Sequence, residues 1–276
     1  MDSINHKPIK ALGQHFITNS DITDKIVLHA NHITDHIVIE IGGGCGILTQ
    51  SIMKVGMPKF LICLERDRNL ISHLEKIAAL YRNLGVVHCD ALEVDEYAVI
   101  RDVLSQQIEG KITIIGNLPY NIATALIWKW LKTINMFSSF TILIQKEVAD
   151  LICEDAEKCS NFLSFVINTL CKTEVLFDLQ PNVFSPPPKV QSSLIYIEPI
   201  ADTKYDCQSL MKFGRILFHN RRKSIRNVLK SLHNYDAFTQ SLCAKGIDLG
   251  KRAENMTRIE LLSIFDELNH FYASDA

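Results

Sequence analysis

The sequence predicts an α/β fold, with an open parallel sheet in a large first domain and a small α-helical domain after it. Up to about residue 199, apolar stretches of strand length alternate with stretches of helical pattern. A glycine-rich turn joins the first strand to the helix after it, which is typical of doubly wound sheets. From Cys207 to the end only helical patterns remain. We therefore expect one domain over residues 1–201 and a second over residues 202–276.

The elements of the first domain follow from apolar runs and the residues that flank them. The first helix begins at Asn19 or Ser20, either of which can cap it. We predict strands at residues 36–41, 59–64, 86–92, 111–115, 140–144, 173–179 and 190–197, and further helices at residues 47–55, 122–131, 145–152 and 161–170.

Composition narrows the class of protein. Of the 276 residues, 47% are hydrophobic and 22% charged, which is ordinary for a soluble globular protein. No apolar run approaches the roughly 20 residues that span a membrane, and Met1–Asn19 lacks the apolar core of a signal peptide. The eight Cys form no CxxC pair and no metal-like spacing with His, so we expect neither zinc nor disulfides. Cys63 and Cys89 are expected to be small core residues of a cytoplasmic protein.

The glycine-rich turn, Gly42–Gly46, follows the strand His36–Ile41 directly. Such a turn lets the backbone approach a cofactor closely, although a plain tight turn is the alternative for these residues alone. Glu65 ends the next strand, close to twenty residues after the glycines. An acidic residue at that place can bind both ribose hydroxyls of an adenosine cofactor, so the spacing favours a cofactor loop.

Two further strands end in polar side chains suited to the same ligand. Asp90 ends the strand at residues 86–92 and can accept a hydrogen bond from an adenine amino group. Lys111–Ile115 leads into Asn117. Because ligands bind along the carboxyl edge of a parallel sheet, we expect these groups to line one site.

The turn Asn117-Leu118-Pro119-Tyr120 can hold an adenine-like amine. The Asn117 amide oxygen and the Leu118 carbonyl oxygen can both accept hydrogen bonds from one amine. Pro119 biases Leu118 towards an extended conformation, which aims that carbonyl. The Tyr120 ring offers a flat face on which a base can stack. For these four residues alone, a strand-terminating turn with Tyr120 packed on the core is the alternative.

A second aromatic residue stands in the stiff segment Pro181–Lys189, whose prolines cannot enter a sheet interior. The prolines hold Phe184 in a fixed place. Its ring serves either as a hydrophobic plug or as a second face for a bound base.

Basic residues open the second domain, and no acidic residue lies between Cys207 and Tyr235. The net charge of −2 argues against a general nucleic-acid binder, so a local patch must carry that function. Arg222, Arg226 and Lys230 are four apart and would share one helical face. A solvated basic face is the usual explanation, but beside a suspected base site we predict a phosphate-binding stripe. The predicted apolar face opposite consists of Ile225, Val228, Leu229 and Leu232.

Together these motifs resemble the ribosomal RNA adenine N6,N6-dimethyltransferases, particularly the bacterial small-subunit (KsgA) type. Gly43 stands where that family commonly has Pro, and Cys45 where Leu is frequent. The resemblance covers nearly the whole chain and runs in the same order through Leu12–Phe16, Glu40–Gly46, Glu65, Asp90–Leu92, Asn117–Tyr120, Gln145–Ala149, Phe184–Val190, Phe218–Lys223 and Arg252–Asn255.

The resemblance implies a Rossmann-like methyltransferase sheet of seven strands, the last antiparallel, with S-adenosyl-L-methionine (SAM) as cofactor. The expected cofactor contacts are Gln14, His15, Ile17, Gly42, Gly44, Gly46, Glu65, Asp90, Ala91 and Asn117. The expected catalytic residues are Asn117, Leu118, Pro119, Tyr120 and Phe184. The expected RNA-binding residues are Lys189, Arg221, Arg222, Lys223, Arg226, Lys230 and Arg252.

The resemblance also implies a substrate and a product. The substrate is a pair of adjacent adenosines in the 3′-terminal hairpin loop of 16S rRNA, within the small ribosomal subunit, and each is dimethylated during subunit biogenesis. We expect a monomer without metal or membrane partner. One alternative is the Erm-type enzyme, which methylates 23S rRNA. Another is a non-catalytic RNA-binding assembly or transcription factor, which would have lost Glu65, Asp90 or Asn117, and none is lost.

Overall fold

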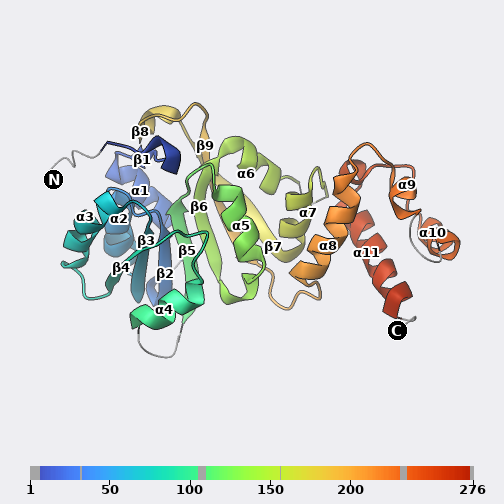
Figure 1. The fold of residues 1–276 in the computed structure, drawn as a ribbon, viewed down its shortest axis with the longest axis horizontal. Helices are drawn as coiled ribbons and strands as arrows, with labels where there is room; N and C mark the ends of the chain where they lie inside the picture. The colour runs from blue at the N-terminus through green and yellow to red at the C-terminus, as the bar shows by residue number, and fades with distance from the viewer. Residues whose placement is uncertain (1–6, 32, 105–109, 156, 231–234, 274–276) are drawn as a thin grey trace. The chain divides into compact units, whose positions relative to one another are not determined.

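The computed structural model describes residues 7–31, 33–104, 110–155, 157–230 and 235–273. Its central feature is a seven-stranded sheet in the order β4-β3-β2-β5-β6-β9-β7 (Figure 1). The strands β2 to β6 pair in parallel, and β9 pairs antiparallel with β6, so the predicted sheet with an antiparallel last strand is confirmed. Their bounds are β2 His36–Ile41, β3 Phe60–Glu65, β4 Leu84–His88, β5 Lys111–Asn117, β6 Ser139–Gln145, β7 Cys171–Leu179 and β9 Ser192–Pro199.

Helices α1 to α6 flank these strands, and α5 lies in front of the sheet in the view of Figure 1. The Asn19 side chain accepts from Asp21 N at 2.8 Å, so Asn19 is the residue that caps α1. The structure adds α3 and α4 to the predicted helices. Their bounds are α1 Ser20–Leu28, α2 Ile47–Ser51, α3 Arg68–Ala78, α4 Glu96–Leu104, α5 Ala123–Leu131 and α6 Lys146–Ile152.

A separate two-stranded sheet ties the N-terminal segment to the proline-rich segment. β1 (Phe16–Ile17) pairs antiparallel with β8 (Phe184–Ser185), and Ile17 lies opposite Phe184. Both side chains are buried, 5% and 4% exposed, in one apolar cluster with residues of β2, β3 and β9. The pairing holds the residues just before β1 near the carboxyl edge of the large sheet.

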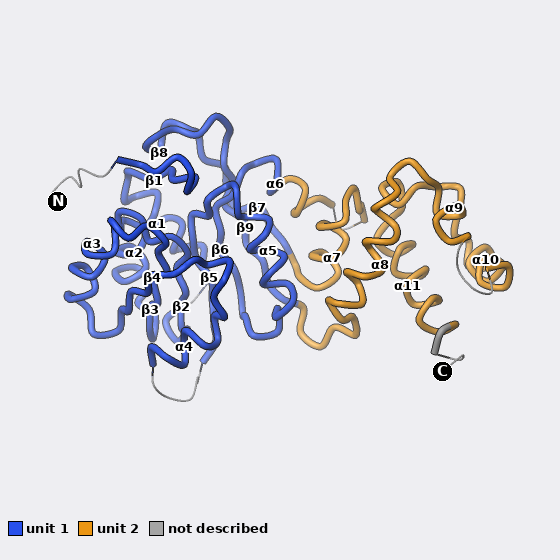
Figure 2. Tube along the Cα trace, in the orientation of Figure 1, with its two compact units in different colours: residues 1–149, 173–199 blue, residues 150–172, 200–276 orange. Residues whose placement is uncertain are grey.

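The chain divides into two compact units, residues 1–149 with 173–199 and residues 150–172 with 200–276 (Figure 2). Compared with the predicted domains, residues 150–172 lie in the second unit instead of the first. The reason is aromatic packing of α7, because Phe165 packs against Phe213 and Phe218 with ring centroids 5.9 and 6.2 Å apart. The helices of unit 2 are α7 Phe162–Leu170, α8 Cys207–His219, α9 Ile225–Leu229, α10 Tyr235–Ala244 and α11 Arg258–Ala273.

The predicted basic helix face is wrong for Arg222. The helix α9 spans only Ile225–Leu229 with Ser224 as its N-cap, so Arg222 lies before it. The apolar side of the prediction is correct for Ile225, Val228 and Leu229, which are buried, whereas Leu232 lies outside the described residues.

In the described part of the chain, no helix has both the length and the apolar character needed to cross a membrane.

Candidate active site

A cavity lies at the carboxyl edge of the parallel strands in unit 1. Its wall includes Gly42 and Gly44 after β2, Glu65 at the end of β3, Asp90 after β4 and Asn117 at the end of β5. The empty volume, including the part open to solvent, is about 780 Å³. The structure therefore brings the four predicted strand ends to one cavity.

Three of the four glycines of the loop, Gly42, Gly44 and Gly46, have a positive φ, but their surroundings differ. A Cβ atom on Gly42 would meet nothing within 4 Å, so this backbone borders open space. A Cβ on Gly46 would lie 2.2 Å from Ile77 Cδ1, and Gly46 does not line the cavity. Gly46 instead lets the start of α2 pack closely on α3.

Gly43 and Cys63 fit each other in the same loop. A Cβ atom at residue 43 would lie 2.2 Å from the Cys63 sulfur, so only glycine fits there beside this thiol. Cys63 is fully buried, as predicted, whereas the prediction is wrong for Cys89, which is half-buried and lines the cavity.

Glu65 is held by the backbone from two sides. Its Oε2 accepts from Gly44 N at 2.8 Å, and its Oε1 accepts from Asp67 N at 2.7 Å. The side chain is 6% exposed, and burial raises the pKa of its carboxyl group, against the lowering effect of these two N–H groups. A carboxylate has about four acceptor sites, so two remain for hydroxyl groups of a ligand.

Asp90 is fixed in a similar way. Its Oδ1 accepts from Leu92 N at 3.0 Å, and its Oδ2 lies 3.1 Å from Arg66 Nη1. Arg66 also lines the cavity, and the sequence analysis missed it. Its position directly after Glu65, at the end of the same strand, is the signal that could have identified it.

Asn117 has a defined amide orientation. Its Nδ2 donates to the carbonyl oxygen of His15 at 2.7 Å. Because a carbonyl can only accept, this contact fixes which end of the amide faces His15 and leaves Oδ1 as an acceptor for another partner. Leu118, Pro119 and Tyr120 line the cavity beside it.

Tyr120 is oriented at both its ends. Its hydroxyl lies 2.5 Å from Ser192 Oγ. Its ring stacks with the His15 ring at 5.5 Å between centroids and 25° between planes. Burial raises the pKa of Tyr120, against the lowering effect of the Ser192 hydrogen bond, so the phenol stays neutral at neutral pH.

The N-terminal segment closes one side of the cavity. Gln14 donates from Nε2 to Asp67 Oδ2 at 2.8 Å, and His15 Nδ1 lies 2.6 Å from Pro186 O. The structure places Gln14 and His15 at the cavity, but Ile17 lines only the smaller hollow beside it. Phe184 lines neither. Lining residues that were not among the predicted site residues are Leu12, Gly13, Phe16, Ile41, Leu64, Arg66, Cys89, Asn121 and Ile122.

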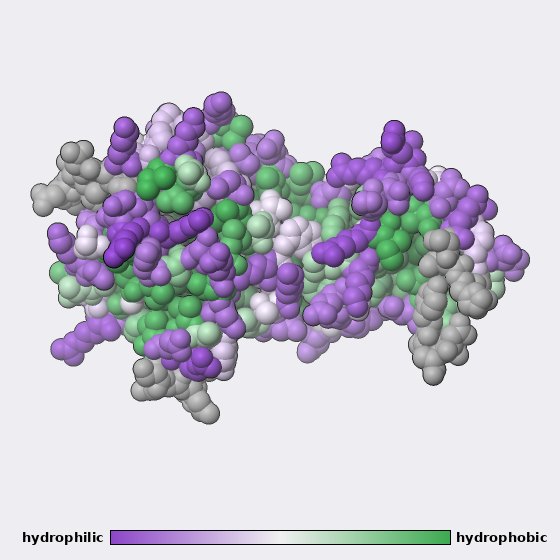
Figure 3. All heavy atoms as spheres, in the orientation of Figure 1, coloured by the Kyte–Doolittle hydropathy of each residue, from purple (hydrophilic) through white to green (hydrophobic). Residues whose placement is uncertain are grey.

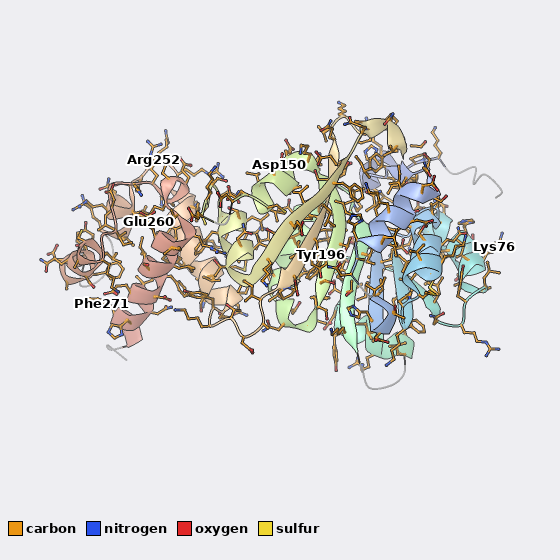
Figure 4. The ribbon with its side chains drawn as sticks, turned by 180° about the vertical axis from the view of Figure 1, so that it is seen from behind. Lys76, Asp150, Tyr196, Arg252, Glu260 and Phe271 are labelled. Carbon is orange, nitrogen blue, oxygen red and sulfur yellow. The ribbon has the colours of Figure 1, made fainter. Side chains whose placement is uncertain are left out.

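The predicted RNA-binding residues of unit 2 are exposed and come from two segments that pair through their backbones. Ile225 N donates to Lys251 O at 2.8 Å and Arg226 N to Leu249 O at 2.9 Å. These bonds bring the segment around α9 beside Arg252, whose side chain is 50% exposed and extends away from the ribbon in Figure 4. Hydrophilic side chains gather on the part of unit 2 that carries α9 (Figure 3). The exposed cations there are Arg221, Arg222, Lys223, Arg226, Lys230 and Arg252, and Lys189 is exposed on unit 1.

Comparisons with known proteins agree with this arrangement. The model of the ribosomal RNA adenine dimethylase family matches residues 5–270. A curated relative from Ehrlichia chaffeensis, named ribosomal RNA small subunit methyltransferase A, is 39% identical over 267 residues, which cover 95% of this chain and 97% of the relative. Among solved structures, a dimethyladenosine transferase from Plasmodium falciparum has a TM-score of 0.77 at 23% identity and covers 93% of this chain and 98% of that one.

The 23S rRNA methyltransferase ErmE has the same fold, with a TM-score of 0.72 at 21% identity over 92% of this chain and 99% of that one. At these identities the solved structures establish the fold alone. The family model spans nearly all of the chain, including both units and every residue that lines the cavity. The chain therefore belongs to the ribosomal RNA adenine dimethylase family.

Proposed function

We propose that the chain transfers methyl groups from SAM to the N6 amines of two adjacent adenosines in the 3′-terminal hairpin loop of 16S rRNA, during biogenesis of the small ribosomal subunit. The product is N6,N6-dimethyladenosine. The observation that carries the proposal is the fixed amide of Asn117 at the wall of a cavity that also contains Glu65 and Asp90. Because the proposed substrate is ribosomal RNA, the protein would work in the cytoplasm. We propose that it acts as a monomer.

The cavity fits an adenosine-containing cofactor. Open space beside Gly42 admits a ligand close to the backbone, and the two remaining acceptor sites of Glu65 match the two hydroxyls of a ribose. Asp90 and Ala91 would hold the adenine end, and Gln14, His15 and Asn117 the methionine end. When bound, SAM supplies an electrophilic methyl group on a positively charged sulfur.

Asn117 and Leu118 prepare the amine of the target base. The lone pair of an adenine amine is delocalised into the ring, which makes it a weak nucleophile. Asn117 Oδ1 and the Leu118 carbonyl oxygen accept its two N–H groups and favour a tetrahedral nitrogen whose lone pair points at the methyl group. Positioning and polarisation of this kind need no covalent intermediate.

Tyr120 holds the flipped base by stacking, and its Ser192 contact keeps the ring in place. After one transfer the amine has a single N–H, so either Asn117 or Leu118 loses its partner. Stacking, worth roughly 1–3 kcal/mol per base, then holds the base for the second transfer. For Phe184 to add a second face, its ring must leave the apolar cluster in which it is buried.

The small-subunit substrate is supported by the name of the Ehrlichia relative, whereas the likeness to ErmE concerns the fold alone. A test uses purified protein and methyl-labelled SAM with separate small and large ribosomal subunits that lack the modification. Label is expected in two adjacent adenosines of the small subunit, as dimethyladenosine by mass spectrometry. Label in the large subunit would support the Erm-type alternative, and no transfer to either RNA would support a non-catalytic protein.

A further inference from the structure

A buried ion pair lies behind the loop that carries Asp90. Lys129, on α5, donates from Nζ to Glu96 Oε1 at 2.7 Å, and Trp130 donates from Nε1 to the same oxygen at 2.7 Å. Glu96 is the first residue of α4, and its side chain is 4% exposed. The Lys129 side chain is 22% exposed. The group connects α5 to the first residue of α4.

Lys129 also makes a contact that the ion pair does not require. Its Nζ donates to the carbonyl oxygen of Ala91 at 2.6 Å. Ala91 lines the cavity and follows Asp90 directly. The loop is bonded to itself next to this point, where Asp90 Oδ1 accepts from Leu92 N. One ammonium group therefore holds the middle of a three-residue loop whose first residue is the predicted partner of the adenine amine.

The charges of Lys129 and Glu96 change the pKa of a residue in the cavity wall. Cys89 lines the cavity, and its pKa is raised to about 11, first by burial and then by the negative charge of Asp90. The positive charge of Lys129 opposes that rise, and the negative charge of Glu96 adds to it. Lys129 and Glu96 therefore lie close enough to the adenine end of the cavity to act on a group there.

The helix α5 also connects this group to the amine-binding turn. Its first turn is bonded to that motif, since Ala123 N donates to Pro119 O at 3.0 Å. Lys129 lies near the other end of the same helix. A single short helix thus begins beside the turn that would hold the target amine and carries, near its other end, the residue that fastens the adenine loop.

We propose that Lys129 is a positioning residue that fastens the Asp90–Leu92 loop against the adenine end of the cofactor, with Glu96 fixing the ammonium group in place. The proposal rests on the proposed use of SAM. Without the bond to Ala91 O, the loop gains freedom that cofactor binding must remove, so affinity falls. Lys129 touches neither cofactor nor RNA in this role, and the rate of transfer from a saturated enzyme stays the same.

The test measures the Kd of S-adenosylhomocysteine by titration calorimetry with the full chain, at a temperature where each variant is folded by circular dichroism. Lys129→Met is expected to raise the Kd about tenfold, the equivalent of 1.4 kcal/mol. Lys132→Met is the matched control, because Lys132 is exposed at the end of the same helix. Its Kd should stay within about twofold of the wild-type value.

Glu96→Gln is the second variant, for use if Lys129→Met does not fold. It keeps an acceptor for Trp130 Nε1 but removes the charge that holds Lys129. The Kd of the Glu96→Gln variant should rise about threefold, a loss of binding free energy roughly half of that expected for Lys129→Met. In activity assays both variants should raise the KM for SAM and leave kcat within about twofold.

A double-mutant cycle separates positioning from general loss of structure. In an Asp90→Ala background, which has no side-chain acceptor for the adenine amine, Lys129→Met should change the Kd less than about twofold, because the loop has already lost the contact that Lys129 serves. A full tenfold effect in that background would overturn the proposal, as would an unchanged Kd for both Lys129→Met and Glu96→Gln in the otherwise wild-type chain. Failure of the wild-type protein itself to bind S-adenosylhomocysteine would instead refute the proposed cofactor.

Discussion

The Asn117 side chain donates from Nδ2 to the carbonyl oxygen of His15 across 2.7 Å, although the two residues are 102 positions apart in the chain. The same His15 stacks its ring on Tyr120. The N-terminal segment thus orients both the amide and the aromatic ring of the motif that would receive the target base. The cavity is formed by the strand ends together with this segment.

Asn117→Ala should abolish methyl transfer while the fold survives, because it removes the oriented acceptor for the amine. We expect kcat to fall by about 100-fold or more, the range for loss of one oriented polar group at a reacting centre. Single-turnover assays with labelled SAM measure the effect. Asn135→Ala, at an exposed amide in the same unit, is the control. A folded Asn117→Ala variant with near wild-type kcat would show that the amine binds elsewhere.

Glu65→Ala should weaken SAM binding far more than RNA binding. A hydrogen bond to a charged group contributes about 1.5–3 kcal/mol, so we expect the Kd for SAM to rise by about 100-fold or more for the two ribose contacts. Calorimetry gives this Kd, and filter binding gives the Kd for RNA, which should change less than about twofold. Glu93→Ala, at an exposed carboxylate, is the control. A Kd for SAM that stays within about twofold would remove Glu65 from the ribose site.

Phe184→Leu should let monomethyladenosine accumulate if the ring becomes a second stacking face for the base. Leucine keeps most of the apolar volume that Phe184 fills in the core, so the variant separates stacking from stability. The ratio of mono- to dimethyladenosine in digested RNA, measured by mass spectrometry, is the readout. Tyr120→Ala serves as the positive control for loss of stacking. A ratio unchanged from wild type in Phe184→Leu would assign that ring to the core alone.

Charge reversal at Arg222 and Arg226 should weaken RNA binding and make it less sensitive to salt. Each lost phosphate contact is expected to reduce the slope of log K against log salt by roughly one unit. Both side chains are exposed, so substitution should not disturb the core of unit 2. The control is Lys76→Glu, an exposed cation on α3 of unit 1 (Figure 4). An identical salt slope for the double variant would mean that this surface is only solvated.

Glu40→Gln should stabilise the protein at pH 8 more than at pH 5. Burial raises the pKa of Glu40 to about 7, against the lowering effect of the Thr49 and Cys63 side chains beside it. A raised carboxyl pKa gives stability that is complete below about pH 4.5 and is lost as the pH rises through about 7. At 1.36 kcal/mol per pKa unit, the free energy of unfolding that the wild-type protein loses as Glu40 ionises over this pH range reaches about 3 kcal/mol.

Urea unfolding of the Glu40→Gln and wild-type proteins at the two pH values measures this difference. Glu75→Gln, at an exposed carboxylate on α3, should show no such dependence. Equal free-energy differences between variant and wild type at pH 5 and pH 8 would contradict a neutral, buried Glu40 at low pH.

Local pattern in the sequence determined the sheet and the edge at which the site lies. An apolar run bounded by polar residues indicates where a strand ends, and the carboxyl ends of parallel strands lie at the same edge of the sheet. Gly42, Glu65 and Asn117 could therefore be brought together without knowledge of any long-range contact. The same pattern could have identified α3, since Leu70, Leu74 and Ile77 are spaced for one helical face and are buried in the structure.

The tertiary structure decided what depends on partners distant in the sequence. The amide of Asn117 faces His15 O, the loop at Asp90 is fastened by Lys129, and Phe184 is buried opposite Ile17. Contacts of this kind depend on side chains that meet only after the sheet has formed. Residues 150–172 join unit 2 for the same reason, because the aromatic partners of α7 lie on α8, about fifty residues later. Sequence periodicity predicts which face of a helix or strand is buried, but it does not predict which residues pack against that face.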